Sequence, residues 1–249
     1  MIVSTKRRTI GFDRKIQLDW LDATADWAAQ GLSIADVRTR LEQLLEGKLA
    51  GDGPHSARGK TMTVLLHIWV LVPDALGPLR DDGLALLRGR SGRDRLPLHW
   101  GMCMATYPFF RDVAATTGRL VSLQGTAALS QIVRRMTESW GERSTLIRAV
   151  QRVVRSLVGW GVLVETNERG IFSAAPRITV ADGVGPWLLE AGISNCEKQT
   201  RPFRSLVGAA SLYPLELRLS ARDVGSSPRL EVYRQGLDED MVMLKARRS

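Results

Sequence analysis

Cysteine is scarce in this chain of 249 residues, which contains only Cys103 and Cys196. Two cysteines give no disulfide framework and fit reduced thiols in the cytoplasm. The longest apolar run, Val64 to Val72, is interrupted by His67 and falls short of the roughly 20 residues that span a bilayer. No apolar segment follows the charged N-terminal start, so a cleaved secretory signal is not expected. We therefore expect a cytoplasmic protein with no membrane partner.

The sequence also has few of the residues that bind metals or nucleotides. His99 and Cys103 could share a helix face, but the chain has only 3 histidines, and no further ligands lie nearby. The segment from Gly53 to Thr61 (GPHSARGKT) has Pro54 where a phosphate-binding loop needs glycine, so Lys60 is expected to be a solvated charge. No Gly-x-Ser-x-Gly elbow is present. We expect no metal, no cofactor and no catalytic activity.

One catalytic alternative remains open in the last segment. Asp223, Glu231 and the run from Asp238 to Asp240 could gather around Mg²⁺ if that segment folds into a sheet. Glu231 is not followed by the Glu-x-Lys pattern of a large nuclease class. A metal-dependent nuclease is therefore the third of three function classes, after a DNA-binding protein and a protein scaffold.

Basic residues exceed acidic ones, and the excess has a location. The chain carries 29 Arg and 6 Lys against 26 acidic residues, a formal charge of +9. The middle segment, residues 119–177, holds 9 basic and 4 acidic side chains and so contributes +5 of that charge. Because Arg binds phosphate and guanine edges bidentately, this bias favours a nucleic-acid partner. A GC-rich genome, which favours Arg codons, would produce the same bias.

Hydrophobic spacing predicts helices over most of the first 95 residues. A stripe from Ile16 to Trp27 ends at Gly31, and Ser33 is a suitable N-cap for a second helix that stops at Gly47. Two apolar helices are expected at 61–72 and 74–87, and a flexible basic connector at 88–95. The seven tryptophans are expected to be core anchors: Trp20, Trp27, Trp69, Trp100, Trp140, Trp160 and Trp187.

The middle segment has the element order of a winged helix-turn-helix. A helix is expected at 102–116, a short strand at 119–123 and a helix at 125–139. Ser144 is expected to cap a further helix that runs to about Val158. Strands at 162–166 and 170–174 follow, joined by residues typical of a hairpin turn.

The helix that follows Ser144 carries the candidate DNA contacts. Its expected core stripe is Leu146, Val150, Val153 and Leu157, with Ile147 and Val154 beside it. On the other face, Arg148 and Arg152 are candidates for base readout, Gln151 for adenine recognition, and Thr145 and Arg155 for phosphate contacts. A solvated face on a structural helix is the alternative. Further candidates are backbone contacts from Arg134, Arg135 and Arg143, and a minor-groove contact from Arg169 at the hairpin tip.

Two runs of sequence carry a family resemblance. The run STLIRAVQRVVRSLVGWGVLVETNERGIF resembles many winged-helix proteins, some of which are protein-docking modules. The run LPLHWGMCMATYPFFRDVAATTGRLVSLQG, Leu96 to Gly125, leads into it and resembles the BREX phage-defence accessory family BrxA. That resemblance covers residues 10 to 180. It implies a small, largely helical protein that binds DNA alongside the methylase, ATPase and phosphatase of a defence operon, and it assigns no site residue.

The sequence therefore predicts a mainly helical α+β chain in three parts. These are a helical N-terminal domain at 1–95, a winged helix-turn-helix domain at 96–178 and a small α/β domain at 179–249. The last is expected to have helices at 184–192 and 202–210 and strands at 214–219, 229–234 and 241–244. The expected function is binding of double-stranded DNA in phage defence. The alternatives are transcription regulation and a scaffold that docks on proteins of the same operon; the oligomeric state stays open.

Overall fold

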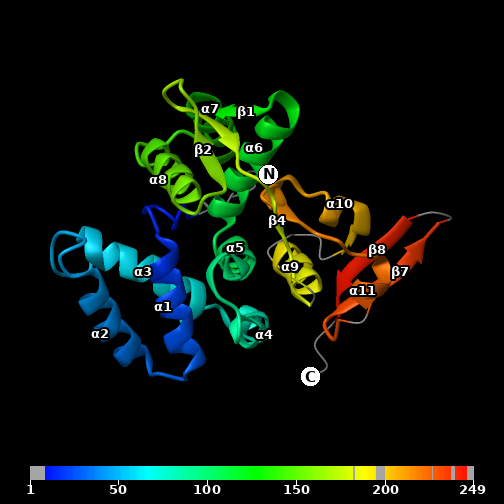
Figure 1. The fold of residues 1–249 in the computed structure, drawn as a ribbon, viewed down its shortest axis with the longest axis horizontal. Helices are drawn as coiled ribbons and strands as arrows, with labels where there is room; N and C mark the ends of the chain where they lie inside the picture. Colours follow the sequence, from blue (N-terminus) through cyan, green and yellow to red (C-terminus); the bar gives the residue numbers. More distant parts are fainter. Residues whose placement is uncertain (1–8, 182, 195–199, 226, 237–238, 246–249) are drawn as a thin grey trace, which may run out of the picture.

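A computed structural model describes residues 9–181, 183–194, 200–225, 227–236 and 239–245 (Figure 1). The chain is mainly helical with three small sheets, a mixed α+β fold. Figure 1 shows the N-terminal helices on one side, a helix-and-sheet unit above them and the C-terminal part on the other side. In the described part of the chain, no single helix combines the length and the apolar character needed to cross a bilayer.

The first part of the chain is helical, as predicted. Its helices are α1 (Leu18–Ala29), α2 (Ile34–Leu45), α3 (Ala57–Trp69) and α4 (Gly77–Leu87), with 3-10 turns η1 (Asp74–Leu76) and η2 (Gly92–Arg95). The predicted N-cap is confirmed, because the Ser33 hydroxyl accepts from the Asp36 N–H at 3.2 Å. Gly31 and Gly47 have φ of 74° and 70°, which L-residues with side chains rarely adopt. Both glycines therefore end their helices where the sequence predicts.

The stretch expected as one helix at 102–116 is helical but is divided at Tyr107, and the strand expected at 119–123 is wrong. Two helices, α5 (Leu96–Thr106) and α6 (Pro108–Gln124), cover this stretch, and the strand β1 (Thr126–Ala128) comes after them. Pro108 lacks an N–H and therefore begins a helix rather than continuing one. Leu120 and Val121 pack on the core from α6, so tertiary packing overrides their strand propensity. The helix ends at Gly125, which has φ of 77°.

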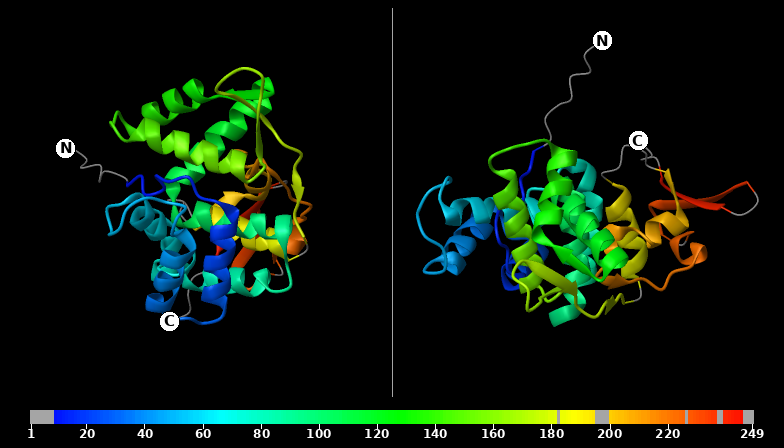
Figure 2. Two further views of the ribbon diagram at one scale, coloured as in Figure 1. Left: turned by 60° about the vertical axis from the view of Figure 1, so that its left-hand side comes forward. Right: turned by 90° about the horizontal axis from the view of Figure 1, so that it is seen from above.

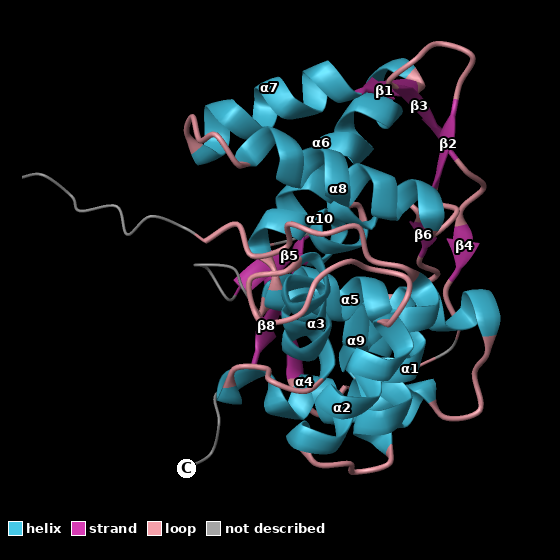
Figure 3. Cartoon of the chain, turned by 90° about the vertical axis from the view of Figure 1, so that its left-hand side faces the viewer, coloured by secondary structure: helices cyan, strands magenta, loops and turns pink. Residues whose placement is uncertain are grey.

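A three-stranded antiparallel sheet joins the next elements. The helices α7 (Leu129–Trp140) and α8 (Leu146–Gly159) are followed by strands β2 (Leu163–Glu165) and β3 (Ile171–Ala174). Strands β2 and β3 pair antiparallel, so the predicted hairpin is confirmed. Strand β1 pairs with the other edge of β3, which gives the strand order β1-β3-β2. In Figure 3, α7 and this sheet form one end of the molecule, and α2 and α4 form the other.

The C-terminal part contains short elements and two small sheets. Its helices are α9 (Val184–Ile193), α10 (Phe203–Val207), α11 (Ala221–Gly225) and the 3-10 turn η3 (Ala210–Leu212). Its strands are β4 (Ile178–Thr179), β5 (Thr200–Pro202), β6 (Leu215–Glu216), β7 (Leu230–Gln235) and β8 (Glu239–Leu244). The helix expected at 202–210 is only the five residues of α10. Strands β4 and β6 pair in parallel, β5-β8-β7 form an antiparallel sheet, and the β7–β8 hairpin extends away from the body (Figure 2).

The centre of the core is α5, which lies between the N-terminal helices and α9 (Figure 1). Six of the seven tryptophans are buried as predicted, and Trp27 is half-buried. The ring of Trp187 on α9 lies against Gly83 and Gly101, where an added Cβ would come within 2.8 and 2.3 Å of it. Helix α5 contacts α3 and α4 of the predicted N-terminal domain and α9 of the predicted C-terminal domain. The three predicted domains therefore share one core, and their boundaries stay a prediction.

A chain of buried polar groups links α3, α5 and α1. The Trp69 indole N–H donates to His99 Nδ1 at 3.1 Å, and His99 Nε2 lies 2.8 Å from Asp22 Oδ1. Since an indole can only donate, Nδ1 is unprotonated and Nε2 carries the hydrogen. Burial lowers the pKa of His99, although the Asp22 carboxylate opposes this. His99 is therefore a neutral structural residue, and Arg95 completes the network through ion pairs to Asp22 and Asp26.

Candidate nucleic-acid interface

Helix α7 is fixed on α6 by its last turn. Trp140 donates its indole N–H to Asp112 on α6 at 3.0 Å and packs edge-on against Phe109 at 5.1 Å between ring centroids. Gly141 follows with φ of 78°, so the chain leaves α7 in a conformation that favours glycine. The orientation of α7 and the start of the turn into α8 are thereby set.

Helix α8 is seated by apolar packing and by two hydrogen bonds at its C-terminal half. Its buried face consists of Leu146, Ala149, Val150, Val153, Val154, Ser156 and Leu157. The Ser156 hydroxyl accepts from the Ile16 N–H at 2.9 Å, and the Trp160 indole donates to the Ile16 carbonyl at 2.9 Å. The segment before α1 therefore runs along one flank of α8 and holds it against the core.

The opposite face of α8 is open. At 100° per residue, Ile147, Arg148, Gln151 and Arg155 fall on one arc, and all four are exposed. Within the described residues, no hydrogen bond or ion pair involves the side chain of Arg148, Gln151 or Arg155. The expectation that Ile147 lies beside the core stripe is wrong, because the residue is 49% exposed. It lies instead next to the polar side chains of this open face.

Arg152 differs from the other arginines of α8. Its Nη1 donates to the Asp13 carbonyl at 2.7 Å and lies 4.0 Å from the Asp13 carboxylate, and its side chain is half-buried. The neighbouring Arg14 also forms an ion pair with Asp13, at 3.2 Å. Burial lowers the pKa of Arg14, and the positive charge of Arg152 lowers it further, whereas the Asp13 carboxylate raises it. Readout of a base by Arg152 would require this contact with its own chain to break.

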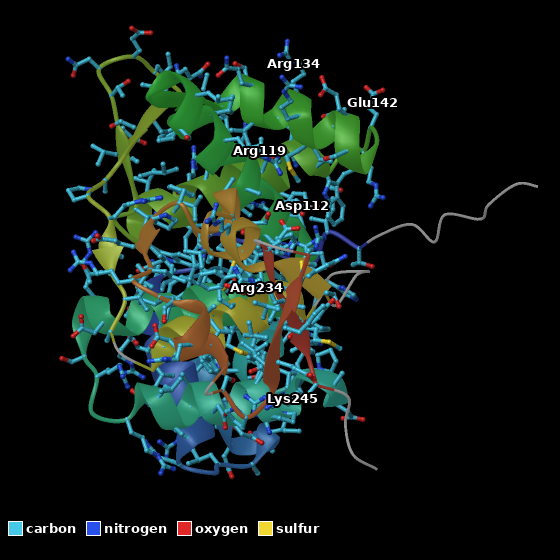
Figure 4. All side chains as sticks on the ribbon, turned by 90° about the vertical axis from the view of Figure 1, so that its right-hand side faces the viewer. Asp112, Arg119, Arg134, Glu142, Arg234 and Lys245 are labelled. Carbon is cyan, nitrogen blue, oxygen red and sulfur yellow. The ribbon has the colours of Figure 1, made fainter. Side chains whose placement is uncertain are left out.

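The remaining predicted residues lie outside α8, on α7, in the turn before α8 and on the β2–β3 hairpin. Arg134 and Arg135 are exposed on α7 and share Glu138, at 3.8 and 3.5 Å; Figure 4 shows Arg134 pointing outward from that helix. Arg143 is half-buried in the turn, and Arg169 is exposed at the tip of the β2–β3 hairpin.

The first turn of α8 differs from the prediction at Ser144. Helix α8 begins at Leu146, with Thr145 in the N-cap position and no side-chain cap bond. Thr145 is exposed, so its hydroxyl is open to a partner. The structure therefore brings Arg148, Gln151 and Arg155 together, places Thr145 and Arg143 before them, and leaves Arg134, Arg135 and Arg169 on separate elements.

The other candidate motifs of the sequence are dispersed or buried in the described part of the chain. No group of three or more His, Cys, Asp or Glu side chains there could hold a metal ion. Cys103 is fully buried and burial raises its pKa, while Asp223 accepts hydrogen bonds from Ser220. Cys196 and Asp238 lie outside the described residues. Asp240 faces Arg234 across the β7–β8 register.

The loop before α3 is folded back on the helix start. The Ser56 hydroxyl accepts from the Gly59 N–H at 3.0 Å and donates to the Gly53 carbonyl at 2.8 Å. A Cβ on Gly59 would lie 2.2 Å from that carbonyl, so only glycine fits there. This arrangement uses an amide that a phosphate-binding loop would offer to its ligand.

Comparison with known proteins gives no relative. No protein-family model, no curated protein and no solved structure matches the chain. The assignment of function therefore depends on the geometry of α7, α8 and the adjoining sheet.

Proposed function

We propose that residues 108–174 form a winged helix-turn-helix and that the protein binds double-stranded DNA through α8, without catalysis. The order α6, β1, α7, α8, β2, β3 and the sheet order β1-β3-β2 support the proposal. The observation that carries it is the open face of α8, where two arginines and a glutamine have no partner among the described residues.

The chemistry of this face suits a major groove, which is about 12 Å wide and admits one helix. Arg148 and Arg155 can bind guanine edges or phosphates bidentately, and Gln151 can pair with adenine. Ile147 offers an apolar surface of the kind that contacts the thymine methyl group. The face can therefore combine charge neutralisation with a modest preference for sequence.

The surrounding residues supply contacts to the DNA backbone. In this proposal, Arg143 and Thr145, in and next to the turn, contact phosphates beside α8, and Arg134 and Arg135 contact phosphates next to α7. Arg169 on the hairpin is the candidate for a minor-groove contact. Arg152, held by Asp13, serves in this proposal to position α8 rather than to read a base. A setting in phage defence rests on the resemblance to the BREX family alone, and transcription regulation is the alternative setting.

A second function, docking on a protein partner, is favoured by exposed apolar side chains in the same unit. Ile147 and Val164 are each 49% exposed. A docking face of this kind would bind its partner with little dependence on salt, whereas phosphate binding falls steeply with salt. The salt dependence therefore separates the two functions.

The test is a titration of a fluorescent duplex of mixed sequence, followed by anisotropy at several salt concentrations. We expect the double variant R148A/R155A to lose at least tenfold in affinity and the slope of log K against log salt to fall by about 2. The control R38A/R222A removes two exposed arginines from α2 and α11 and is expected to bind as the wild type does. Equal binding by both double variants would reject α8 as the DNA-binding element.

A further inference from the structure

A groove lies between the start of α8 and the start of α3. It has a volume of about 580 Å³, and one wall comes from the N-terminal helical part. The side chains that matter for its chemistry are His55, Lys60 and Thr63 on that wall, Arg143 and Thr145 on the other, and Asp13 on the floor. Sequence reasoning could not find this groove, because its walls are some eighty residues apart in the chain.

The walls and floor of the groove are held in place. The Ser56 and Gly59 contacts described above fix the loop that carries His55 to the first turn of α3. Beneath the lining residues Gly11 and Asp13, the chain is anchored by Phe12, which is fully buried and packs edge-on against Tyr107 at 5.4 Å between ring centroids. The groove is therefore a built feature of the fold.

The lining of the groove contains more basic than acidic side chains. Lys60 and Arg143 bring positive charge from opposite walls, and within the described residues no hydrogen bond or ion pair involves the Lys60 ammonium group. The one carboxylate, Asp13, lies 3.2 Å from Arg14 and 4.0 Å from Arg152, so its charge is already compensated. The Thr145 hydroxyl adds a hydrogen-bond donor, whereas the Thr63 hydroxyl already donates to the Gly59 carbonyl at 3.0 Å. This set suits an extended anion with phosphate groups.

We propose that this groove seats a phosphate backbone of the duplex whose major groove receives α8. The inference rests on the proposed function and extends the DNA interface onto the helical N-terminal part. Thr145 belongs to both surfaces, so a strand that flanks α8 continues into the groove. Duplex DNA carries one negative charge per about 1.7 Å of axis, so such a strand brings phosphates within reach of both walls.

The test compares Lys60→Gln, Lys60→Arg and Lys245→Gln in the full chain, by anisotropy with the same duplex. Lys245 lies in the C-terminal part, away from α7 (Figure 4), and its ammonium group donates to the Ser227 carbonyl at 3.3 Å. We expect Lys60→Gln to lower the salt slope by about 1 and to weaken binding several-fold at low salt. Lys60→Arg keeps the charge and is expected to bind like the wild type, as is Lys245→Gln. Equal thermal midpoints verify that the variants are folded.

The possible failures can be told apart. If the wild type binds duplex with a steep salt slope and Lys60→Gln behaves like the wild type, the groove is not part of the interface. If Lys245→Gln loses as much as Lys60→Gln, the loss reflects net charge and the groove assignment is again wrong. If the wild type shows no salt-sensitive binding at all, the proposed function itself fails.

Discussion

Acidification is expected to destabilise the fold through His99. Its Nδ1 accepts a hydrogen bond from Trp69 and its Nε2–H donates to Asp22, so a second proton on the ring would face the indole N–H. Burial lowers the pKa of His99 below the ordinary value of about 6.5. The unfolded chain therefore binds a proton that the folded chain does not, and stability is lost as the pH falls below that value.

The size of the effect follows from linkage. A histidine that stays neutral when folded and titrates at about pH 6.5 when unfolded costs about 1 kcal/mol of unfolding free energy between about pH 6.5 and 5.5, which is the upper limit for His99. The limit at lower pH is about 1.4 kcal/mol per pH unit. The loss disappears above about pH 7.5, where both states are neutral.

Urea unfolding at about pH 7.5, 6.5 and 5.5 measures this term when wild type, His99→Gln and His67→Gln are compared. His67 is the control because it is exposed on α3. We expect the pH slope of His99→Gln to be shallower than that of the wild type, and His67→Gln to keep most of the wild-type slope. Nitrogen chemical shifts of the ring should show the Nε2–H tautomer at about pH 6. Parallel stability curves for wild type and His99→Gln, or a ring protonated on both nitrogens at that pH, would refute the reasoning.

Two further predictions concern packing. Gly101→Ala places a methyl group against the Trp187 ring, whose indole N–H donates to the Leu79 carbonyl at 2.8 Å, and is expected to cost about 1–3 kcal/mol in thermal unfolding. Gly77→Ala is the control, because a Cβ there meets nothing within 4 Å. Equal thermal midpoints for the two variants would contradict the close approach of Gly101 to Trp187. Ser156→Ala leaves the buried Ile16 N–H without its acceptor and is expected to cost about 1–3 kcal/mol in urea unfolding, with a loss near zero as the contrary result.

Local signals in the sequence predicted much of the fold, and tertiary packing decided the rest. The helix starts and stops at Ser33, Gly31 and Gly47 depend on neighbouring residues, so they could be found from sequence. Residues 119–123 have strand propensity but belong to α6. Their helical state depends on packing of Leu120 and Val121 against the core, which the local sequence does not show. The expected helix at 202–210 is shorter for a local reason, because α10 begins after Pro202 and ends at Gly208.

The same division holds for the candidate interface. Helical periodicity placed Arg148, Gln151 and Arg155 on one face, because that depends on spacing alone. The difference between Arg152 and these residues comes from Asp13, which lies far away in the sequence and contacts α8 only in the folded chain. The exposure of Ile147 has the same origin, since the width of the buried face depends on which elements cover α8.

The position of α8 on DNA is tested most directly by photocrosslinking. A duplex with 4-thiothymidine carries sulfur at the O4 position of thymine, which lies in the major groove. After irradiation of the complex, mass spectrometry of the digested protein identifies the attached segment. We predict attachment within Thr145 to Arg155. Salt-sensitive binding with crosslinks only to the C-terminal sheet, or with none on α8, would contradict the proposal.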